Sequence, residues 1–199
     1  MSKSKWDTEF NTDEYMYGKE PNDFLKENYS AIPKGKVLLI AEGEGRNAVF
    51  LAKLGYQVTA VDISIVGLEK AKKLAAENNV EIETICEDLQ TFDLGHEKWE
   101  GIVSISCHLP PALRKELSKR IESALTPKGV YLMEGYTPEQ LNYKTGGPPV
   151  AEMMTSKQTV IEEFPNLQFS HLKELEREII EGVNHFGLAA VVQVIGSPK

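Results

Sequence analysis

The alternation of apolar and polar positions is most informative in the first third of the chain. Residues 37–40 form an uninterrupted apolar run, as in a parallel strand that is covered on both faces. A glycine-containing turn follows, and a helix is predicted over 46–54 that ends at Gly55. A second strand over 57–61 ends at the carboxylate of Asp62. The pattern predicts one βαβ unit with a ligand site where the strands end.

The turn of this unit contains Gly43 and Gly45. Glycine takes positive φ and has no Cβ, so a ligand can approach the backbone and the N-terminus of the next helix. Asp62 follows the first glycine by about 20 residues, where a carboxylate accepts hydrogen bonds from ribose hydroxyls. The unit predicts an adenosine-type ligand. It leaves nicotinamide and methyl-donor cofactors both open, because matches to GxGxxG are weak alone.

The rest of the chain continues as alternating helices and strands and closes with a hairpin. The predicted elements are a helix capped by Ser64, strands over 81–86 and 101–106, a helix from Pro110 to about Leu125, a strand over 130–134, a helix from Ser156 to Phe164, and hairpin strands over 169–180 and 188–195. Strands that alternate with helices predict an α/β fold around a parallel sheet, and the hairpin predicts antiparallel pairing at one edge.

Two segments outside this pattern are predicted to lie over the ligand. Residues 1–30 carry six aromatic side chains and a short helix that Asn22 or Asp23 could cap. Aromatic rings around a glycine suit a covering segment that opens and closes, although a helix that only fills an apolar surface is the alternative. The second segment, 135–155, is a long loop rich in glycine and proline, and loops of this length are usually functional or disordered. It is expected to be a loop on the substrate side of the site.

Composition narrows the class of protein. The 199 residues suit a single domain over 1–199. A formal charge of −8 argues against nucleic acid as a partner, because binding phosphates needs a basic surface. No segment is apolar enough to span or anchor in a membrane, so a cytoplasmic protein is expected. Cys86 and Cys107 lie in strand-like stretches and are predicted to be two buried thiols, and no spacing of ligands indicates a metal.

Several strings in order resemble one family. They are YGKEPNDFL, AEGEGRNAVFLA, VTAVDIS, CEDL, SCHLPPALR, YTPEQL with TGGPP, and EGVNHFG. The chain resembles class I S-adenosylmethionine-dependent methyltransferases, and most closely the branch of tellurite-resistance and thiopurine methyltransferases. A carboxylate after the third strand, the short chain and the terminal hairpin favour the same class. The resemblance implies a Rossmann-like, doubly wound sheet of seven strands in the order 3-2-1-4-5-7-6, with strand seven antiparallel.

The resemblance also implies which residues hold S-adenosylmethionine. They are Glu42, Gly43 and Gly45 at the methionine part, Arg46 at its carboxylate, Asp62 at the ribose, Ile63, Asp88 and Leu89 around the adenine, Ser104 or Ser106 beside the sulfonium, and Tyr17 in the covering segment. Leu39 departs from the family pattern, which has an acidic residue at this point of the first strand. Recognition of the amino group is therefore expected to shift to Glu42 or to the loop backbone.

Methyl transfer from a sulfonium is an in-line displacement in which positioning supplies most of the acceleration. A soft anion needs no base, whereas a neutral amine or hydroxyl does. The candidate substrate-side residues are His108, Arg114, Tyr136 and His185, the last with Glu181. The expected acceptor is a small molecule, with a thiol or a chalcogen oxyanion as candidates, and the expected state is a monomer or homodimer. Two alternatives stay open, a nicotinamide-dependent oxidoreductase and a non-catalytic nucleoside-binding protein.

Overall fold

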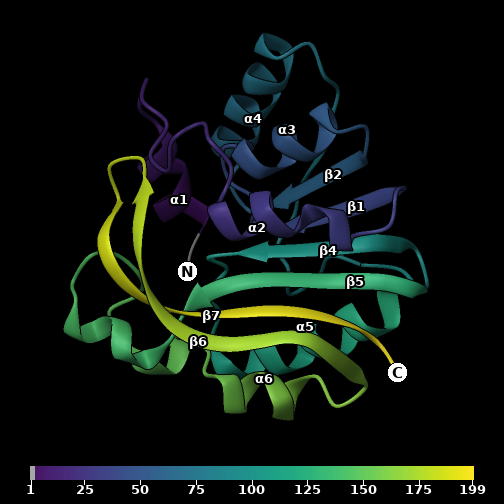
Figure 1. The fold of residues 1–199 in the computed structure, drawn as a ribbon. Helices are drawn as coiled ribbons and strands as arrows, with labels where there is room; N and C mark the ends of the chain where they lie inside the picture. The colour runs from purple at the N-terminus through teal and green to yellow at the C-terminus, as the bar shows by residue number, and fades with distance from the viewer. Residues whose placement is uncertain (1–2) are drawn as a thin grey trace.

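The computed structural model describes residues 3–199 and is built on one seven-stranded sheet in the order β3-β2-β1-β4-β5-β7-β6 (Figure 1). β1 to β5 run parallel, and β7 runs antiparallel to both of its neighbours. The strands are β1 (Lys36–Ile40), β2 (Gln57–Asp62), β3 (Glu83–Cys86), β4 (Trp99–Ile105), β5 (Leu125–Tyr136), β6 (Leu167–Glu181) and β7 (His185–Pro198). The predicted α/β class, strand order and antiparallel strand are confirmed.

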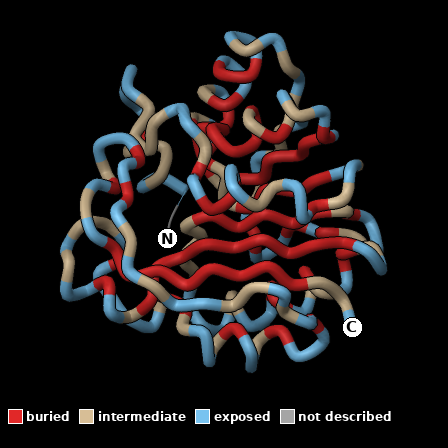
Figure 2. Tube along the Cα trace, viewed as in Figure 1, coloured by how far each residue is buried: buried red, intermediate tan, exposed pale blue. Residues whose placement is uncertain are grey.

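Helices cover both faces of the sheet. They are α1 (Lys3–Phe10), α2 (Asp23–Asn28), α3 (Arg46–Lys53), α4 (Ile65–Glu77), α5 (Pro111–Ala124) and α6 (Lys157–Glu163), with short 3₁₀ turns at Tyr29–Ala31, Pro138–Asn142 and Ala151–Met153. Leu38 and Ile40 of β1 pack in one core with α5 and α6, whereas Val37 and Leu39 pack in the other with α2, α3 and α4. The uninterrupted apolar run of β1 is thus explained by cover on both faces, and Figure 2 shows the central strands buried along most of their length.

The chain reverses its direction across the sheet between β1 and β4. From β1 it proceeds through α3 and α4 to β2 and β3, and from β4 it proceeds through α5 to β5 on the other side. Ala41 and Ser106, the residues directly after β1 and β4, have φ angles of 51° and 54°. This left-handed conformation costs a non-glycine residue about 1–2 kcal/mol. Both strained residues line the cavity at the switch point, where α/β folds bind ligands.

The β6–β7 hairpin projects beyond the parallel strands and its tip lies beside the N-terminal segment (Figure 1). Asn184 Nδ2 donates to Glu9 Oε1 of α1 at 2.9 Å, and the Val183 amide donates to the Met16 carbonyl at 3.0 Å. The hairpin predicted from the sequence is present. Its strands are longer than predicted, and three residues, 182–184, separate them.

Both cysteines are free thiols, but they are not both buried. Cys107 is half-buried, whereas Cys86 is exposed, so the prediction of two buried thiols is wrong for Cys86. Cys86 ends β3, an edge strand with no neighbour on one side, and its thiol donates to the Ile63 carbonyl at 3.5 Å. No helix among the described residues is long and apolar enough to cross a membrane.

Candidate active site

A cavity of about 760 Å³ lies at the carboxyl ends of β1 to β4 and is bounded by α1 and by residues 147–149. Pockets for small molecules typically enclose about 300–1,000 Å³. The structure brings most of the predicted site residues to this cavity, namely Tyr17, Glu42, Gly43, Arg46, Asp62, Ile63, Asp88, Leu89, Ser106, His108 and His185. Gly45, Ser104, Arg114 and Tyr136 are not part of its wall. The predicted residues therefore fall into a group that a ligand can touch and a group behind it.

Asp62 ties the end of β2 to the turn after β1. Its Oδ2 accepts from the Gly43 amide at 2.9 Å and its Oδ1 accepts from the Ser64 amide at 2.8 Å. Burial raises the pKa of this carboxyl group, although the amide hydrogen bonds oppose the shift. Each carboxylate oxygen has two lone pairs, so both oxygens keep capacity for a ligand hydroxyl. The two amides fix the direction in which that capacity points.

Glu42 stands at the start of α3. Its Oε1 accepts from the Ala48 amide at 2.7 Å, and burial raises its pKa to about 7. Leu39, in contrast, is fully buried in the core beneath α3. Glu44, in the same turn, is already paired with Lys70. Glu42 is thus the carboxylate that this turn offers to a positively charged group, and its charge changes near neutral pH.

Gly45 serves packing rather than ligand contact. Its φ is 86°, and a Cβ there would lie 2.5 Å from the Cβ of Ala71 in α4. Only glycine allows α3 to begin this close to α4. The prediction that Gly45 faces the ligand differs from this placement, because its missing side chain points toward α4.

The other end of the cavity is open to solvent and has a carboxylate at its rim. Asp88, two residues after β3, is exposed, and its Oδ1 accepts from the Gln90 amide at 2.8 Å. Leu89 beside it is buried, and Ile63 after β2 is half-buried. Two apolar side chains and a rim carboxylate suit a planar heterocycle with an exocyclic amino group.

Arg46 is paired inside the protein. Its Nη2 lies 2.7 Å from Glu181 Oε2, and both side chains are buried. Glu181 Oε1 accepts from Asn22 Nδ2 at 2.9 Å, and His185 Nδ1 lies 3.4 Å from Glu181 Oε2. Burial would raise the pKa of Glu181, but these hydrogen bonds and the charge of Arg46 outweigh it and hold the pKa well below its usual range. Arg46 therefore lines the cavity, but its positive charge is already balanced by the carboxylate of Glu181.

Asn22 contributes more than the cap expected of it. The Asn22 side chain does cap α2, since its Oδ1 accepts from the Leu25 amide at 3.1 Å. Its Nδ2 also donates to Glu134 Oε1 at 2.7 Å, in addition to Glu181. Glu134 in turn pairs with Arg177 at 2.7 Å. A buried polar network thus connects the N-terminal segment to β5 and β6. The sequence signal for it was the charge of Glu134 within the apolar run of β5.

His108, Tyr136 and His185 form a ring cluster at the inner end of the cavity. The Tyr136 ring stacks on His108 with centroids 5.3 Å apart and meets the His185 ring edge-on at 5.3 Å. Burial lowers the pKa of His108 to about 3, so its imidazole is neutral. Tyr136 is 1% exposed and lies behind the two histidines, where burial raises its pKa. The histidines therefore face the cavity, and Tyr136 holds them in place.

Arg114 and Ser104 support other parts of the structure. Arg114 Nε lies 3.0 Å from Glu163 Oε2, and its Nη1 donates to the Glu152 carbonyl at 3.0 Å. These bonds attach the 135–155 segment and α6 to α5. Ser104, on β4, is buried. Neither side chain reaches the cavity.

The N-terminal helix contributes aromatic wall residues that the sequence pattern did not place on a helix. Trp6 and Phe10 of α1 line the cavity and stack with ring centroids 5.4 Å apart. A Cβ at Gly43 would lie 3.0 Å from Phe10 Cζ, so this ring rests on the glycine turn. Their four-residue spacing is the signal that could have predicted one helical face. Within residues 3–199 no cluster of three or more His, Cys, Asp or Glu side chains is arranged to hold a metal ion.

Comparisons with known proteins agree with this geometry. Residues 37–129, just under half of the chain, match the family model described as a methyltransferase domain. No curated protein matches the sequence. The strand order and the antiparallel strand β7 are those of the class I methyltransferase fold, which the family resemblance implied.

Three solved structures illustrate the likeness. One, from work on conversion of a disulfide bond into a thioacetal group during echinomycin biosynthesis, is 16% identical with a TM-score of 0.77, covering 99% of this chain and 91% of that chain. TehB from Haemophilus influenzae is 18% identical with a TM-score of 0.73, covering 99% and 67%. A SAM-dependent methyltransferase from Anabaena variabilis is 14% identical with a TM-score of 0.73, covering 99% and 93%. At these identities the shared feature is the fold.

Proposed function

We propose that this protein is an S-adenosylmethionine-dependent methyltransferase that acts on a small molecule. The observation that carries the proposal is the cavity at the switch point, where the glycine turn, Asp62 and the rim carboxylate of Asp88 lie along one wall. The methyltransferase domain match and neighbours such as the Anabaena variabilis SAM-dependent methyltransferase support the same cofactor.

The cavity wall offers a complementary group for each part of such a cofactor. Asp62 would accept hydrogen bonds from the ribose hydroxyls, and Asp88 would accept one from the adenine amino group. Ile63 and Leu89 would flank the adenine ring. Glu42 would pair with the amino group of the methionine part, which the buried Leu39 cannot do. Arg46 is a weaker candidate for the methionine carboxylate, because Glu181 already matches its charge.

The reaction needs positioning and, for a protonated nucleophile, a base. The bound cofactor supplies a methyl group on a positively charged sulfur, which is already a good leaving group. His185 would accept a proton from the acceptor at Nε2, because its Nδ1 faces Glu181. Glu181 stays ionised and would stabilise the imidazolium that forms, as a carboxylate behind a catalytic histidine does. His108, neutral and part of the same wall, would orient the acceptor through a hydrogen bond.

Two segments would enclose the reaction. α1 with Tyr17 covers one side of the cavity, and residues 147–149 of the 135–155 segment cover another. Exclusion of water strengthens electrostatic interactions in a site. The contact of Glu9 with Asn184 connects α1 to the turn that precedes His185, so closing of α1 and placement of the base would be linked.

The test is transfer of a labelled methyl group from S-adenosylmethionine to a panel of thiols, selenite, tellurite, thiopurines and small amines. Saturable transfer to any of them supports the proposal. Binding of S-adenosylhomocysteine without transfer to any acceptor supports the non-catalytic alternative. Stabilisation by NADH and none by S-adenosylhomocysteine supports the oxidoreductase alternative, because a ligand stabilises the protein that binds it.

A further inference from the structure

We infer that the acceptor end of this cavity takes a nucleophile that arrives uncharged or as a cation, and that it discriminates against oxyanions. The inference rests on the proposed methyltransferase function and names the charge class of its acceptor. Of the two acceptors expected from the sequence, it favours the thiol over the chalcogen oxyanion and adds small amines. It follows from the charges, the hydrogen-bonding groups and the rings of the wall.

Carboxylates outnumber cations around the cavity. Among residues 3–199, six acidic side chains line it against two basic ones, and one of the six, Glu44, is paired with Lys70. The acidic residues are Glu9, Glu42, Glu44, Asp62, Asp88 and Glu116, and the basic residues are Lys5 and Arg46. Low-dielectric walls of one sign focus the field within a cleft and raise the local concentration of ligands of the opposite sign. An anion therefore enters against the field of the wall, and a cation enters with it.

The buried cation at the acceptor end is already neutralised. Arg46 lies 2.7 Å from Glu181, and Glu181 takes a further bond from Asn22. Arg177 also lies 3.8 Å from Glu181, but it is closer to a carboxylate of its own. Two other arginines near this end are paired in the same way outside the wall, Arg177 with Glu134 and Arg114 with Glu163. An oxyanion needs a cation or several donors to replace its lost hydration. No arginine at this end offers an unmatched charge among the described residues.

His108 supplies a hydrogen-bonding group without supplying charge. His108 Nε2 is buried with no hydrogen-bond partner, and burial keeps the ring neutral by lowering its pKa to about 3. A neutral imidazole offers one donor and one acceptor nitrogen. An unpartnered buried nitrogen beside the cavity matches a polar atom on the acceptor, and a charged oxygen would find no charge to pair with there.

Aromatic rings complete a wall suited to positive charge. Trp6, Phe10 and Tyr17 line the cavity, and the Tyr17 ring lies 4.7 Å from the His185 ring. The faces of aromatic rings attract cations, most strongly the face of tryptophan. Carboxylates and rings together are the groups that recognise ammonium ions, whereas both repel an oxyanion.

The proton balance of the reaction agrees with this class. A thiol or hydroxyl keeps its lone pair while its proton passes to His185, the new bond to the methyl carbon forms, and the electrons of the carbon–sulfur bond stay with sulfur. An ammonium group has no lone pair until one proton leaves, so it too requires the base. Chalcogen oxyanions such as selenite and tellurite already carry a free lone pair on the chalcogen, so methylation there does not require the Glu181–His185 pair to remove a proton.

The test compares benzylamine with benzoate, which are similar in size and opposite in charge, on the protein saturated with S-adenosylhomocysteine. Thermal shift and calorimetry at constant ionic strength should show binding of benzylamine at least tenfold tighter than that of benzoate. Equal binding, or tighter binding of benzoate, overturns the inference. Failure of S-adenosylhomocysteine itself to bind instead overturns the proposed function, so the two failures are distinguishable.

A charge-matched variant tests the stated cause. Glu181→Gln removes the carboxylate that neutralises Arg46, and it should reduce the preference for benzylamine at least tenfold. Glu178→Gln, an exposed position on the same strand, is the control and should leave the preference unchanged. An unchanged preference in a folded Glu181→Gln protein overturns the role given to Arg46. If that variant does not fold, the comparison of the two ligands on the natural protein decides alone.

Discussion

Glu181 and His185 are the last cross-strand pair of the β6–β7 hairpin, and His185 Nδ1 lies 3.4 Å from Glu181 Oε2. Because only residues 182–184 separate them, the geometry of the turn sets the distance between carboxylate and imidazole. The same carboxylate binds Arg46 of α3, so the hairpin tip is attached to the helix that begins at the cofactor turn. The proposed base, its carboxylate and the helix after the glycine turn are therefore parts of one buried network.

Replacement of the proposed base should slow the chemical step. His185→Gln should lower the turnover number by about 10²- to 10⁴-fold for an acceptor that carries a proton. The affinity for S-adenosylhomocysteine should stay within about twofold, because Nδ1 of His185 faces Glu181 rather than the proposed cofactor contacts. Single-turnover kinetics and calorimetry separate the two effects.

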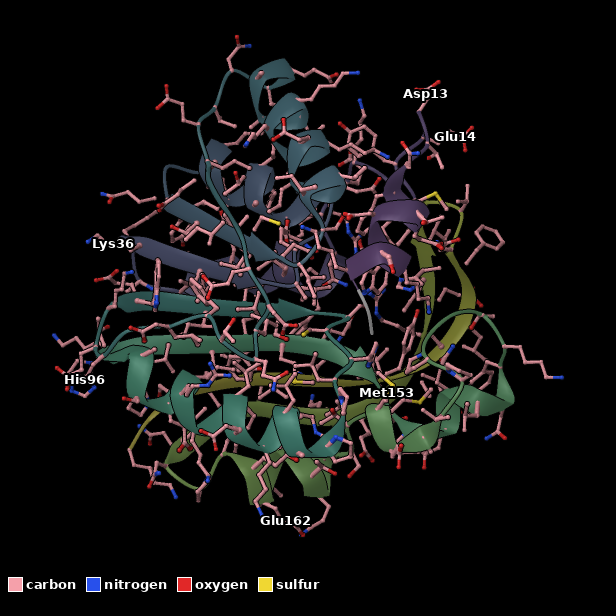
Figure 3. The ribbon with its side chains drawn as sticks, turned by 180° about the vertical axis from the view of Figure 1, so that it is seen from behind. Asp13, Glu14, Lys36, His96, Met153 and Glu162 are labelled. Atoms are coloured by element: carbon pink, nitrogen blue, oxygen red, sulfur yellow. The ribbon has the colours of Figure 1, made fainter. Side chains whose placement is uncertain are left out.

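The control for this variant is His96→Gln. His96 is exposed and lies with Lys36 at the opposite end of the sheet from the cavity (Figure 3). Its replacement should leave transfer unchanged. Equal turnover in the His185→Gln and natural proteins would show that His185 is not the base.

The Arg46–Glu181 pair should make the protein sensitive to acid. The pKa of Glu181 lies well below its ordinary value of 4.5, so the unfolded chain binds the proton more readily than the folded chain. Its stabilising contribution is complete above about pH 4.5 and is lost as the pH falls through the folded-state pKa. Glu181→Gln should cost about 3–5 kcal/mol at pH 7, because Arg46 is left buried without its partner.

Denaturant unfolding between pH 3 and pH 7 measures this prediction, at roughly unit intervals. The variant should lose less stability than the natural protein over the acid range. Parallel curves for the two proteins would contradict the assignment of the acid sensitivity to Glu181.

Binding of the cofactor should depend on the charge of Glu42. Burial raises its pKa to about 7, so the ionised form is incomplete below neutrality. A group whose folded-state pKa is raised in this way lowers the stability of the free protein as the pH rises from 4.5 to 7. A bound amino group should favour the ionised form of Glu42 and so offset this loss of stability. Affinity for S-adenosylhomocysteine should therefore rise with pH up to about 7 and then level off.

Glu42→Gln provides the comparison, since the amide keeps the size of the side chain without the charge. The variant should bind more weakly at pH 8 and show no rise between pH 5.5 and 8. A rise of the same size in both proteins would assign the titration to another group.

Alanine substitutions at two glycines with the same backbone conformation distinguish the cost of overpacking from the cost of backbone strain. Gly45 and Gly55 have φ angles of 86° and 85°, but a Cβ at Gly45 meets Ala71 at 2.5 Å whereas a Cβ at Gly55 meets nothing within 4 Å. Gly55→Ala should cost about 1–2 kcal/mol from the left-handed conformation alone. Gly45→Ala should cost about 1–3 kcal/mol more from overpacking. Equal losses of unfolding free energy in the two variants, measured by urea denaturation, would refute the packing role of Gly45.

The sequence predicted the sheet well because its signals are local. The apolar run of β1, the glycine turn and Asp62 follow one another within a single βαβ unit, and each element there has its own pattern. The order of the strands came from the family resemblance rather than from periodicity. It is the order that the structure has.

What the sequence could not provide are contacts between distant segments. Arg46 and Glu181 are 135 residues apart, and nothing in the local pattern of either predicts their pairing. Tyr136 was expected at the substrate, but burial places it behind the histidines. α1 carries only two apolar side chains, Trp6 and Phe10, and its placement depends on Phe10 packing over the glycine turn.

This cavity is proposed to bind S-adenosylmethionine, and the decisive measurement is calorimetric titration with S-adenosylhomocysteine and with NADH. Asp88→Asn and Asp93→Asn form a matched pair, because each aspartate is exposed and accepts from the amide two residues on, at 2.8 and 2.9 Å, but only Asp88 lines the cavity. S-adenosylhomocysteine should bind the natural protein and Asp93→Asn equally, and it should bind Asp88→Asn about tenfold more weakly because one hydrogen bond is lost. NADH should not bind. Binding of NADH without binding of S-adenosylhomocysteine would contradict the proposal.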